Sequence, residues 1–290
     1  MYSIQDLERL SGIKAHTIRV WEKRYNLLEP DRTDTNIRYY NDDQLRKLLN
    51  TSTLITHGGK ISKVSKLSES EMSSEVEALM MPASKGEQLD VFINKIIESG
   101  LSYNNQLFEA AFAAASIRLG LYRCYRHVII PTLIKLGLMW GTNNLWPAQE
   151  HFISNLIRQK LFAAIDGLNV PEANSKKYLL FLPEYEHHEI GLLFAHYLIR
   201  KSGKTVIYLG PNVPTQDLEA TIKRLNPDVL ILFVVRTWHK DELISMMQRV
   251  TKSFKKGKTI LCGRSALTDV IQENKSLVKA QSIEDLENKI

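Results

Sequence analysis

The feature that most constrains the fold is a change in the spacing of apolar residues near residue 174. After this point, short apolar runs alternate with helical stretches, and such runs are typical of buried strands. Strand–helix alternation predicts a doubly wound, Rossmann-like α/β fold with a parallel sheet over residues 175–290. The predicted strands are 177–182, 205–209, 228–235, 259–262 and 277–280.

Residues 89–170 carry apolar side chains at helical spacing throughout, which predicts a four-helix bundle. The preceding stretch, 69–88, is rich in Ser and Glu, is poor in aromatic residues, and contains Pro82 and Gly86. This composition favours a linker, partly helical, between the bundle and a separate N-terminal domain over residues 1–68.

The N-terminal domain contains a basic helix placed directly after a turn. In the tract SGIKAHTIRVWEKRYNLLEPDRTD, Gly12 separates two short helical patterns, and the second runs over 14–25 around an apolar Ile18 and Trp21. A Pro-led turn and a short strand with Arg38 follow. This order is that of a winged helix-turn-helix, whose second helix enters the major groove of DNA.

Charge supports DNA as the partner of this domain. Residues 1–68 hold twelve Lys/Arg and eight Asp/Glu, which accounts for most of the net charge of +6. We expect Arg19, Lys23, Arg24, Arg32 and Arg38 to hold phosphates, which orient the protein without reading sequence. The residues expected to reach base edges are Lys14, His16 and Thr17, and the interface is completed by Trp21 and Tyr39.

The order SIQDLERLSGIKAHTIRVWEKRY…LLEPDR…IRYY resembles the MerR family of winged-helix transcription regulators. The resemblance implies binding to double-stranded promoter or operator DNA, with RNA polymerase as an indirect partner. It also implies a homo-oligomer, a dimer or tetramer. The long coiled-coil helix of many relatives is missing here, so the contacts between copies are expected from the bundle and sheet domains.

A second candidate site follows the first predicted strand. Glu186, His187, His188 and Glu189 stand at its carboxyl end, and Gly191 opens the next helix. Ligands of open α/β sheets bind at this edge. A carboxylate can hold the proton of one imidazole nitrogen while the other binds a metal, and the Glu186–His188 spacing suits that arrangement. We expect His187 to be solvent-exposed.

The sequence Glu186-x-His188-x-x-Gly191 resembles the D-x-H-x-x-G motif of cobalamin-binding domains. The resemblance implies adenosyl- or methylcobalamin as cofactor, His188 as the lower axial ligand of cobalt, and Glu186 as its support. In the bundle, Trp140 is followed at W-x9-EH spacing by Glu150 and His151. This arrangement resembles the cap over the upper cobalt ligand in the light-sensing, cobalamin-dependent MerR repressors.

The chain departs from the family pattern at three places. Phe233 stands where the pattern has a serine, and Cys262-Gly263 stands where it has Gly-Gly, so bulk replaces groups that contact the nucleotide tail. Gly263 remains a candidate cofactor-binding residue. Gly141 stands where light-sensing members carry a histidine that captures cobalt after photolysis. Two alternatives stay open: a cobalamin domain with an altered tail pocket, or a domain without cofactor.

The expected function is that of a DNA-binding transcription regulator, a repressor by this resemblance, that senses a corrinoid. The alternative is a cofactor-free MerR-type regulator controlled by a protein partner or another ligand. An enzyme is not expected, because no nucleophile–base constellation is visible. Two cysteines, no apolar run long enough to span a bilayer and no signal-peptide pattern predict a cytoplasmic protein without membrane contact.

Overall fold

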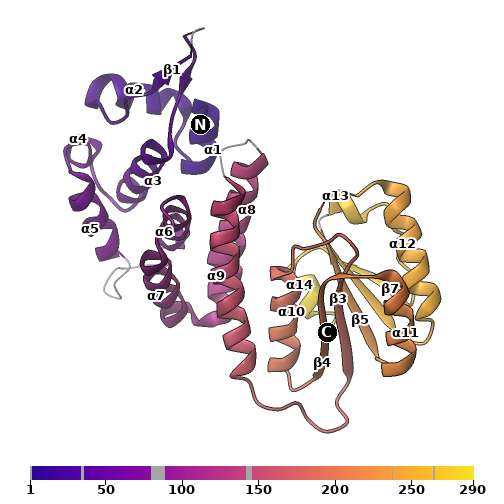
Figure 1. The fold of residues 1–290 in the computed structure, drawn as a ribbon. Helices are drawn as coiled ribbons and strands as arrows, with labels where there is room; N and C mark the ends of the chain where they lie inside the picture. The colour runs from indigo at the N-terminus through magenta and orange to yellow at the C-terminus, as the bar shows by residue number, and fades with distance from the viewer. Residues whose placement is uncertain (1, 34–35, 80–88, 142–145, 237, 264) are drawn as a thin grey trace. The chain divides into compact units, whose positions relative to one another are not determined.

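The computed structural model describes residues 2–33, 36–79, 89–141, 146–236, 238–263 and 265–290. The chain divides into two compact units, Met1–Leu156 and Ile157–Ile290. The first unit contains α1 (Ile4–Ser11), α2 (Ala15–Tyr25), β1 (Asp31–Arg32), β2 (Arg38–Tyr39), α3 (Asp42–Thr56), α4 (Ile61–Val64), α5 (Glu69–Leu79), α6 (Leu89–Leu101), α7 (Asn105–Cys124), the π-helix η1 (Tyr125–Ile129), α8 (Ile130–Gly141) and the start of α9 (Pro147–Asp166) (Figure 1).

The N-terminal elements form the predicted winged helix-turn-helix. Ser3 and Asp6 form a capping box at the start of α1, and Gly12, at φ 76°, ends that helix in the left-handed conformation. Ile18 and Trp21 point α2 into the core, at 0% and 8% exposure. Strands β1 and β2 pair antiparallel and form the wing. The basic helix therefore has one packed face and one exposed face.

Part of the segment predicted as a linker is an ordered helix. Met72 and Val76 of α5 are buried with Leu54 of α3 and Val91 of α6 in one hydrophobic cluster. Apolar residues four apart lie on one face of a helix, and these two anchor α5 to its neighbours. Residues 80–88, the remainder of the predicted linker, lie outside the described residues.

The predicted bundle consists of α6, α7 with η1, α8 and α9. Gly120 of α7 has φ 74°, so the helix is interrupted there before the π turn. Gly100 of α6 allows close packing, because a Cβ at this position would lie 2.0 Å from Cδ1 of Ile153 in α9. Buried polar contacts also join the bundle to the N-terminal helices, since Asn94 Nδ2 donates to Thr53 Oγ1 at 2.9 Å.

The second unit is the predicted doubly wound sheet. Its five strands are parallel and lie in the order β4-β3-β5-β6-β7. The elements, after the end of α9, are β3 (Lys177–Pro183), α10 (Ile190–Lys201), β4 (Thr205–Val213), α11 (Thr215–Leu225), β5 (Val229–Val234), α12 (Lys240–Ser253), β6 (Lys258–Gly263), α13 (Ser265–Thr268), β7 (Leu277–Ala280) and α14 (Ile283–Glu287).

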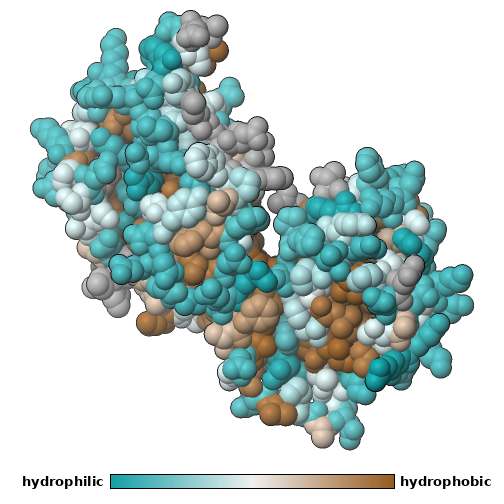
Figure 2. Space-filling view, viewed as in Figure 1, coloured by the Kyte–Doolittle hydropathy of each residue, from teal (hydrophilic) through white to brown (hydrophobic). Residues whose placement is uncertain are grey.

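Alternating side chains of the strands fill two hydrophobic layers. One face of the sheet packs on α10 and α14, and the other packs on α11 and α12 (Figure 1). The chain order reverses between β3 and β5, so this is the topological switch point where ligands of open α/β sheets bind. The edge strand β4 is largely half-buried, and Figure 2 shows apolar surface on this unit.

Among the residues that the structure describes, none of the helices has the length and apolar character needed to cross a membrane.

Both cysteines, Cys124 and Cys262, are buried and are free thiols. Burial raises the pKa of the Cys124 thiol to about 11 despite a hydrogen bond from Ser116, and burial also raises that of Cys262. Both thiols are therefore held protonated in the core, where they pack as small apolar residues.

Candidate functional site

The recognition helix α2 presents the expected basic face. Most of the predicted DNA-contacting side chains are exposed, while Thr17, Arg38 and Tyr39 are half-buried and Trp21 lies in the core. Trp21 is therefore positioned to hold the helix, not to offer its ring to a groove. The exposed set is Lys14, His16, Arg19, Lys23, Arg24 and Arg32.

Glu8 of α1 fixes the start of α2. Its carboxylate accepts a hydrogen bond from Lys14 Nζ at 2.9 Å and from the Ala15 amide at 2.9 Å. The hydrogen bond from the Lys14 ammonium, and then that from the Ala15 N–H, lowers the pKa of Glu8. The Glu8 carboxylate in turn raises the pKa of Lys14. One carboxylate thus replaces the side-chain cap that Lys14 cannot supply, and it orients the first turn of the recognition helix.

The wing is tied to the recognition helix through Glu22. The Tyr40 hydroxyl donates to one carboxylate oxygen of Glu22, and Arg38 Nε lies 3.4 Å from the other. Arg32, in the wing itself, donates to Asn36 Oδ1 at 2.6 Å. Tyr40 and Arg38 therefore hold the wing against the recognition helix, and Arg32 stabilises the wing itself, which suits a DNA contact made by both elements.

The second site lies where β3 ends, at the switch point. His188 Nδ1 lies 2.5 Å from Glu186 Oε1, and the His188 side chain is 59% exposed, whereas that of Glu186 is fully buried. A ring that donates through Nδ1 carries its lone pair on Nε2, the atom that can bind a metal. His187 is exposed as expected, and its backbone amide donates to Glu186 Oε1 at 3.1 Å.

Glu186 also holds the loop to the neighbouring strand. Its Oε2 accepts hydrogen bonds from the amides of Val235 at 2.8 Å and Arg236 at 2.9 Å, directly after β5. Burial raises the pKa of the Glu186 carboxyl, but the bonds from His188 and from these amides outweigh it and lower the pKa to about 2. The carboxylate is therefore ionised and bridges the two strands of the switch point.

Glu189, at the end of this loop, is held by two residues from other elements, Arg158 and Tyr208. Glu189 is buried, forms an ion pair with Arg158 of α9, and accepts a hydrogen bond from the Tyr208 hydroxyl at 2.8 Å. Burial, and then the bond to Glu189, raises the pKa of Tyr208. The motif E-Y-E-H-H-E contains Glu189, but nothing in the sequence indicates that its partners come from α9 and β4.

The tail side of the predicted site is filled by protein. A Cβ on Gly191 would lie 2.8 Å from Cε1 and 3.0 Å from Cδ1 of Phe233, so the phenyl ring lies against the helix start. A Cβ on Gly263 would lie 2.8 Å from the Val234 carbonyl oxygen. Both glycines thus have a packing role within the chain. The Glu186–His188 pair has the donor set of an imidazole metal ligand, whereas the Phe233 ring lies beside Gly191, where the sequence pattern has a serine.

The candidate cap residues lie at the ends of α8 and α9. Trp140 is near the end of α8, and its side chain is not among those that the structure describes. Glu150 and His151, in the first turn of α9, pair with each other at 2.9 Å between Oε2 and Nδ1, and the His151 side chain is 71% exposed. These residues belong to the first compact unit and His188 to the second.

The residue before the Glu-His pair connects the bundle to the DNA-binding elements. Gln149 is buried, and its Nε2 donates to Asp42 Oδ2 and to the Leu101 carbonyl, both at 3.2 Å. The other oxygen of Asp42 accepts a bond from the Tyr2 hydroxyl at 2.7 Å, and Tyr2 exchanges backbone bonds with Tyr40. Because Tyr40 binds Glu22, a continuous polar chain runs from the start of α9 to the recognition helix.

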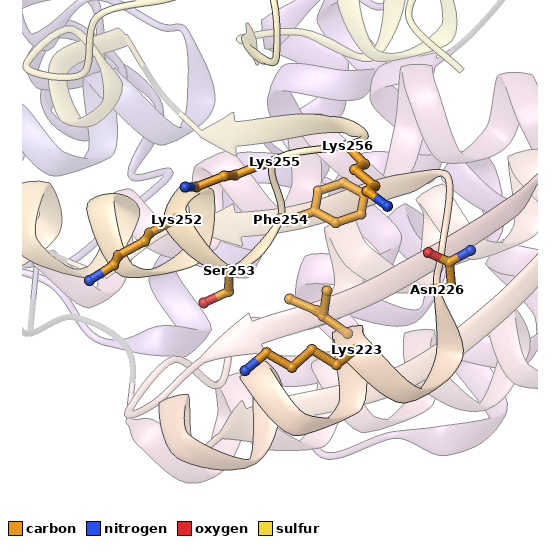
Figure 3. A pocket seen from close by; sticks show the side chains of 8 residues that line it. Lys223, Asn226, Lys252, Ser253, Phe254, Lys255 and Lys256 are labelled. Atoms are coloured by element: carbon orange, nitrogen blue, oxygen red, sulfur yellow. The ribbon is translucent and has the colours of Figure 1, made fainter.

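A separate hollow of about 250 Å³ lies at the opposite, amino edge of the sheet. It is formed by the ends of α11 and α12, with the ring of Phe254 between lysine side chains (Figure 3). Its four lysines are Lys223, Lys252, Lys255 and Lys256. Helices that follow parallel strands end at this edge, so the hollow is distinct from the site at His188.

Together, these elements combine a winged helix-turn-helix with a helical bundle and a doubly wound sheet that carries a candidate ligand site at its switch point. Three family models match the chain: "MerR HTH family regulatory protein" over residues 2–71, and two models of a "B12 binding domain" over residues 92–164 and 177–273. The chain therefore carries a MerR helix-turn-helix domain and B12-binding domains, and cobalamin is the cofactor class that such domains bind.

The chain is also homologous to two named repressors over most of its length. It is 26% identical to the HTH-type transcriptional repressor CarH of Myxococcus xanthus, over 91% of this chain and 89% of CarH. It is 26% identical to CarA of the same organism, over 84% of this chain and 80% of CarA. The chain therefore resembles these two repressors over both its helix-turn-helix domain and its effector half.

A solved structure shares the fold of the effector half. The monomethylamine corrinoid protein of Methanosarcina barkeri matches 68% of this chain and 94% of its own length, with a TM-score of 0.52 and 13% sequence identity. At this identity the match concerns the fold alone. It confirms the prediction of helices followed by a Rossmann-like sheet.

Substitution of the buried carboxylate tests the strand-bridging role. Because the folded-state pKa of Glu186 is about 2 and its ordinary value is 4.5, its charged form contributes about 3 kcal/mol above pH 4.5. This contribution is lost as the pH falls from 4.5 toward 2. We therefore expect Glu186→Gln to lower the free energy of unfolding by about 3 kcal/mol at pH 7, and by much less at pH 3.

Urea unfolding at the two pH values measures this difference. Glu184→Gln, in the same loop, is the control and is expected to leave the stability nearly unchanged at both. A Glu186→Gln deficit of equal size at pH 7 and pH 3 would contradict the ionised bridge.

Proposed function

We propose that this protein is a DNA-binding transcription regulator, acting as a repressor, that senses a corrinoid through its effector half. His188 would be the axial ligand of cobalt, with Glu186 holding the ring by its Nδ1 proton. The single observation that carries this proposal is the 2.5 Å contact of the exposed His188 ring with the buried, ionised Glu186 at the switch point of the sheet. The cofactor, when bound, would supply a cobalt–carbon bond on its upper face.

The DNA-binding role rests on α2 and the wing. Arg19, Lys23, Arg24, Arg32 and Arg38 would contact phosphates, while Lys14, His16 and Thr17, on the first turn of α2, would reach base edges. Tyr39 would add a contact from the wing. The bonds of Glu22 to the wing support a single orientation of these groups.

In the effector half, Trp140, Glu150 and His151 would cap the upper face of the corrinoid. Gln149 gives this cap a physical route to DNA, because its amide binds Asp42 at the start of α3. A cofactor that shifts the first turn of α9 would alter this bond. The change would then be transmitted through Tyr2 and Tyr40 to the recognition helix. Binding of the corrinoid would thereby change the affinity for DNA.

We propose that the chain has three domains, at 1–68, 89–170 and 175–290, with a linker at 69–88 between the first two. Copies of the chain would associate through the effector half, which the half-buried edge strand β4 and the apolar surface of Figure 2 favour. The protein would act in the cytoplasm on operator DNA, with RNA polymerase affected indirectly. A regulator is favoured over an enzyme because the relatives that match most of the chain are named repressors.

The second candidate function is a regulator whose effector half responds without a corrinoid. The specific observation that favours it is the phenyl ring of Phe233 against Gly191, which occupies the space beside the candidate site. Control would then come from a protein partner or from another ligand.

The spectrum of bound corrinoid tests the proposed site. We expect the protein, desalted after incubation with adenosylcobalamin or adenosylcobinamide in the dark, to retain a corrinoid band with the spectrum of a histidine-ligated cobalt. In His188→Ala this spectrum is expected to be lost, because the side chain that ligates cobalt is removed. His187→Ala, at the neighbouring exposed position, is the control and should keep it. If the wild type retains neither adenosylcobalamin nor adenosylcobinamide, the proposal is refuted in favour of a cofactor-free regulator.

Removal of a single phosphate contact tests the DNA-binding surface. We expect Arg19→Ala to weaken binding to all DNA and to reduce the slope of log K against log salt by about 0.9. Fluorescence anisotropy over a series of salt concentrations measures both quantities. Arg224→Ala, an exposed arginine of α11, should change neither, and an unchanged slope in Arg19→Ala would exclude this role for Arg19.

The polar chain from α9 to the recognition helix predicts a coupling defect. Gln149→Leu should leave corrinoid binding and basal DNA binding present, but reduce the corrinoid-dependent change in DNA affinity, which is about 5- to 150-fold in typical allosteric systems. Titration of DNA with and without corrinoid measures this ratio. Gln159→Leu, on an exposed face of the same helix, is the matched control. A wild-type ratio in Gln149→Leu would show that the bond to Asp42 carries no coupling.

A further inference from the structure

The aromatic ring of Phe233 packs between the sheet and the start of α10. Gly191 lies three residues after His188, and Cε1, Cδ1 and Cζ of Phe233 would lie 2.8, 3.0 and 3.6 Å from a Cβ placed on it. Phe233 belongs to β5, and its side chain packs on the same sheet face as α10. The glycine therefore makes room for the protein's own ring, since even a methyl group at position 191 would collide with it.

The neighbouring strand closes the same layer. Cys262 of β6 pairs in register with Phe233, so the two side chains lie next to each other on the α10 face. Cys262 is 2% exposed and belongs to the same hydrophobic cluster. Beside His188, the layer between sheet and helix is thus occupied by side chains of β5 and β6.

This packing matters for the ligand because of a geometric requirement. A cobalamin carries a nucleotide that ends in a base, and this base occupies the lower face of cobalt in the free cofactor. If His188 takes that position, the base and its ribose phosphate must be placed elsewhere, next to the histidine. A corrinoid without the nucleotide has no such requirement. Close-packed interiors do not yield space for a large group without displacing side chains.

We infer that this effector domain selects corrinoids that lack the nucleotide tail, of the cobinamide class, and that Phe233 is the residue that sets this specificity. The inference rests on the proposed function, because it assumes that His188 binds cobalt. Phe233 acts by occupying the layer that a tail would enter, and Cys262 supports it by filling the adjacent register position. Full cobalamin binds only with the ring of Phe233 displaced, and therefore more weakly.

Comparison of two corrinoids tests the inference. Dissociation constants for aquacobinamide and aquacobalamin are measured by spectral titration of the full-length wild type, Phe233→Ser and Phe233→Ser/Cys262→Gly. We expect the wild type to bind cobinamide at least tenfold more tightly than cobalamin. Each opened variant should gain at least tenfold in cobalamin affinity, with little change for cobinamide, because only the tail needs the vacated space.

Two controls separate specificity from damage to the fold. Phe181→Leu shortens a buried aromatic residue on the opposite sheet face and should keep the wild-type preference. Thermal unfolding of each variant reports whether the sheet is intact, and unchanged cobinamide affinity in Phe233→Ser shows the same at the site itself.

The outcomes distinguish this inference from the proposed function. Equal wild-type affinity for the two corrinoids, unaltered by Phe233→Ser, would overturn the selectivity while leaving the corrinoid site in place. Binding of neither corrinoid by the wild type or by any opened variant would overturn the proposed site and the selectivity together. Cobalamin binding that appears only in the opened variants would support Phe233 as the barrier to the tail.

Discussion

The buried carboxylate of Glu186 is the interaction on which the effector half depends. One oxygen accepts bonds from the His188 ring and the amides of the same loop, and the other accepts the amides that follow β5. A buried charge is costly unless it is fully hydrogen-bonded, and five donors meet that condition here. The same group thus joins the loop after β3 to the end of β5 and sets the tautomer of His188.

Local patterns predicted most of the fold. The strands of the sheet, the basic face of α2 and the helices of the bundle follow from apolar spacing and from capping residues such as Ser3 and Asn41. The helical part of the segment 69–88 was predicted, but its packing was not, because Met72 and Val76 hold α5 through contacts with α3 and α6. Such contacts are distant in sequence, and composition alone does not reveal them.

In the candidate site too, contacts within one loop could be predicted from the sequence, whereas contacts between distant elements could not. The Glu186–His188 pair could be predicted because its members are two residues apart and meet within one loop. The bonds of Glu189 to Arg158 and Tyr208, and of Gln149 to Asp42, join elements far apart in the chain and became apparent only in the fold. Phe233 was noticed as a departure from a motif. Its physical meaning, a ring packed on Gly191, required the register of β5 beside α10.

The most direct test of the account is the identity of the atom that ligates cobalt. Electron paramagnetic resonance of the bound corrinoid, reduced to cobalt(II), reports a single axial nitrogen by its superhyperfine splitting. In protein labelled with ¹⁵N-histidine and given unlabelled cofactor, we predict that the ¹⁴N triplet becomes a doublet, because the imidazole of His188 supplies that nitrogen. A triplet that persists after labelling, or no nitrogen splitting in the wild type, would contradict ligation by His188.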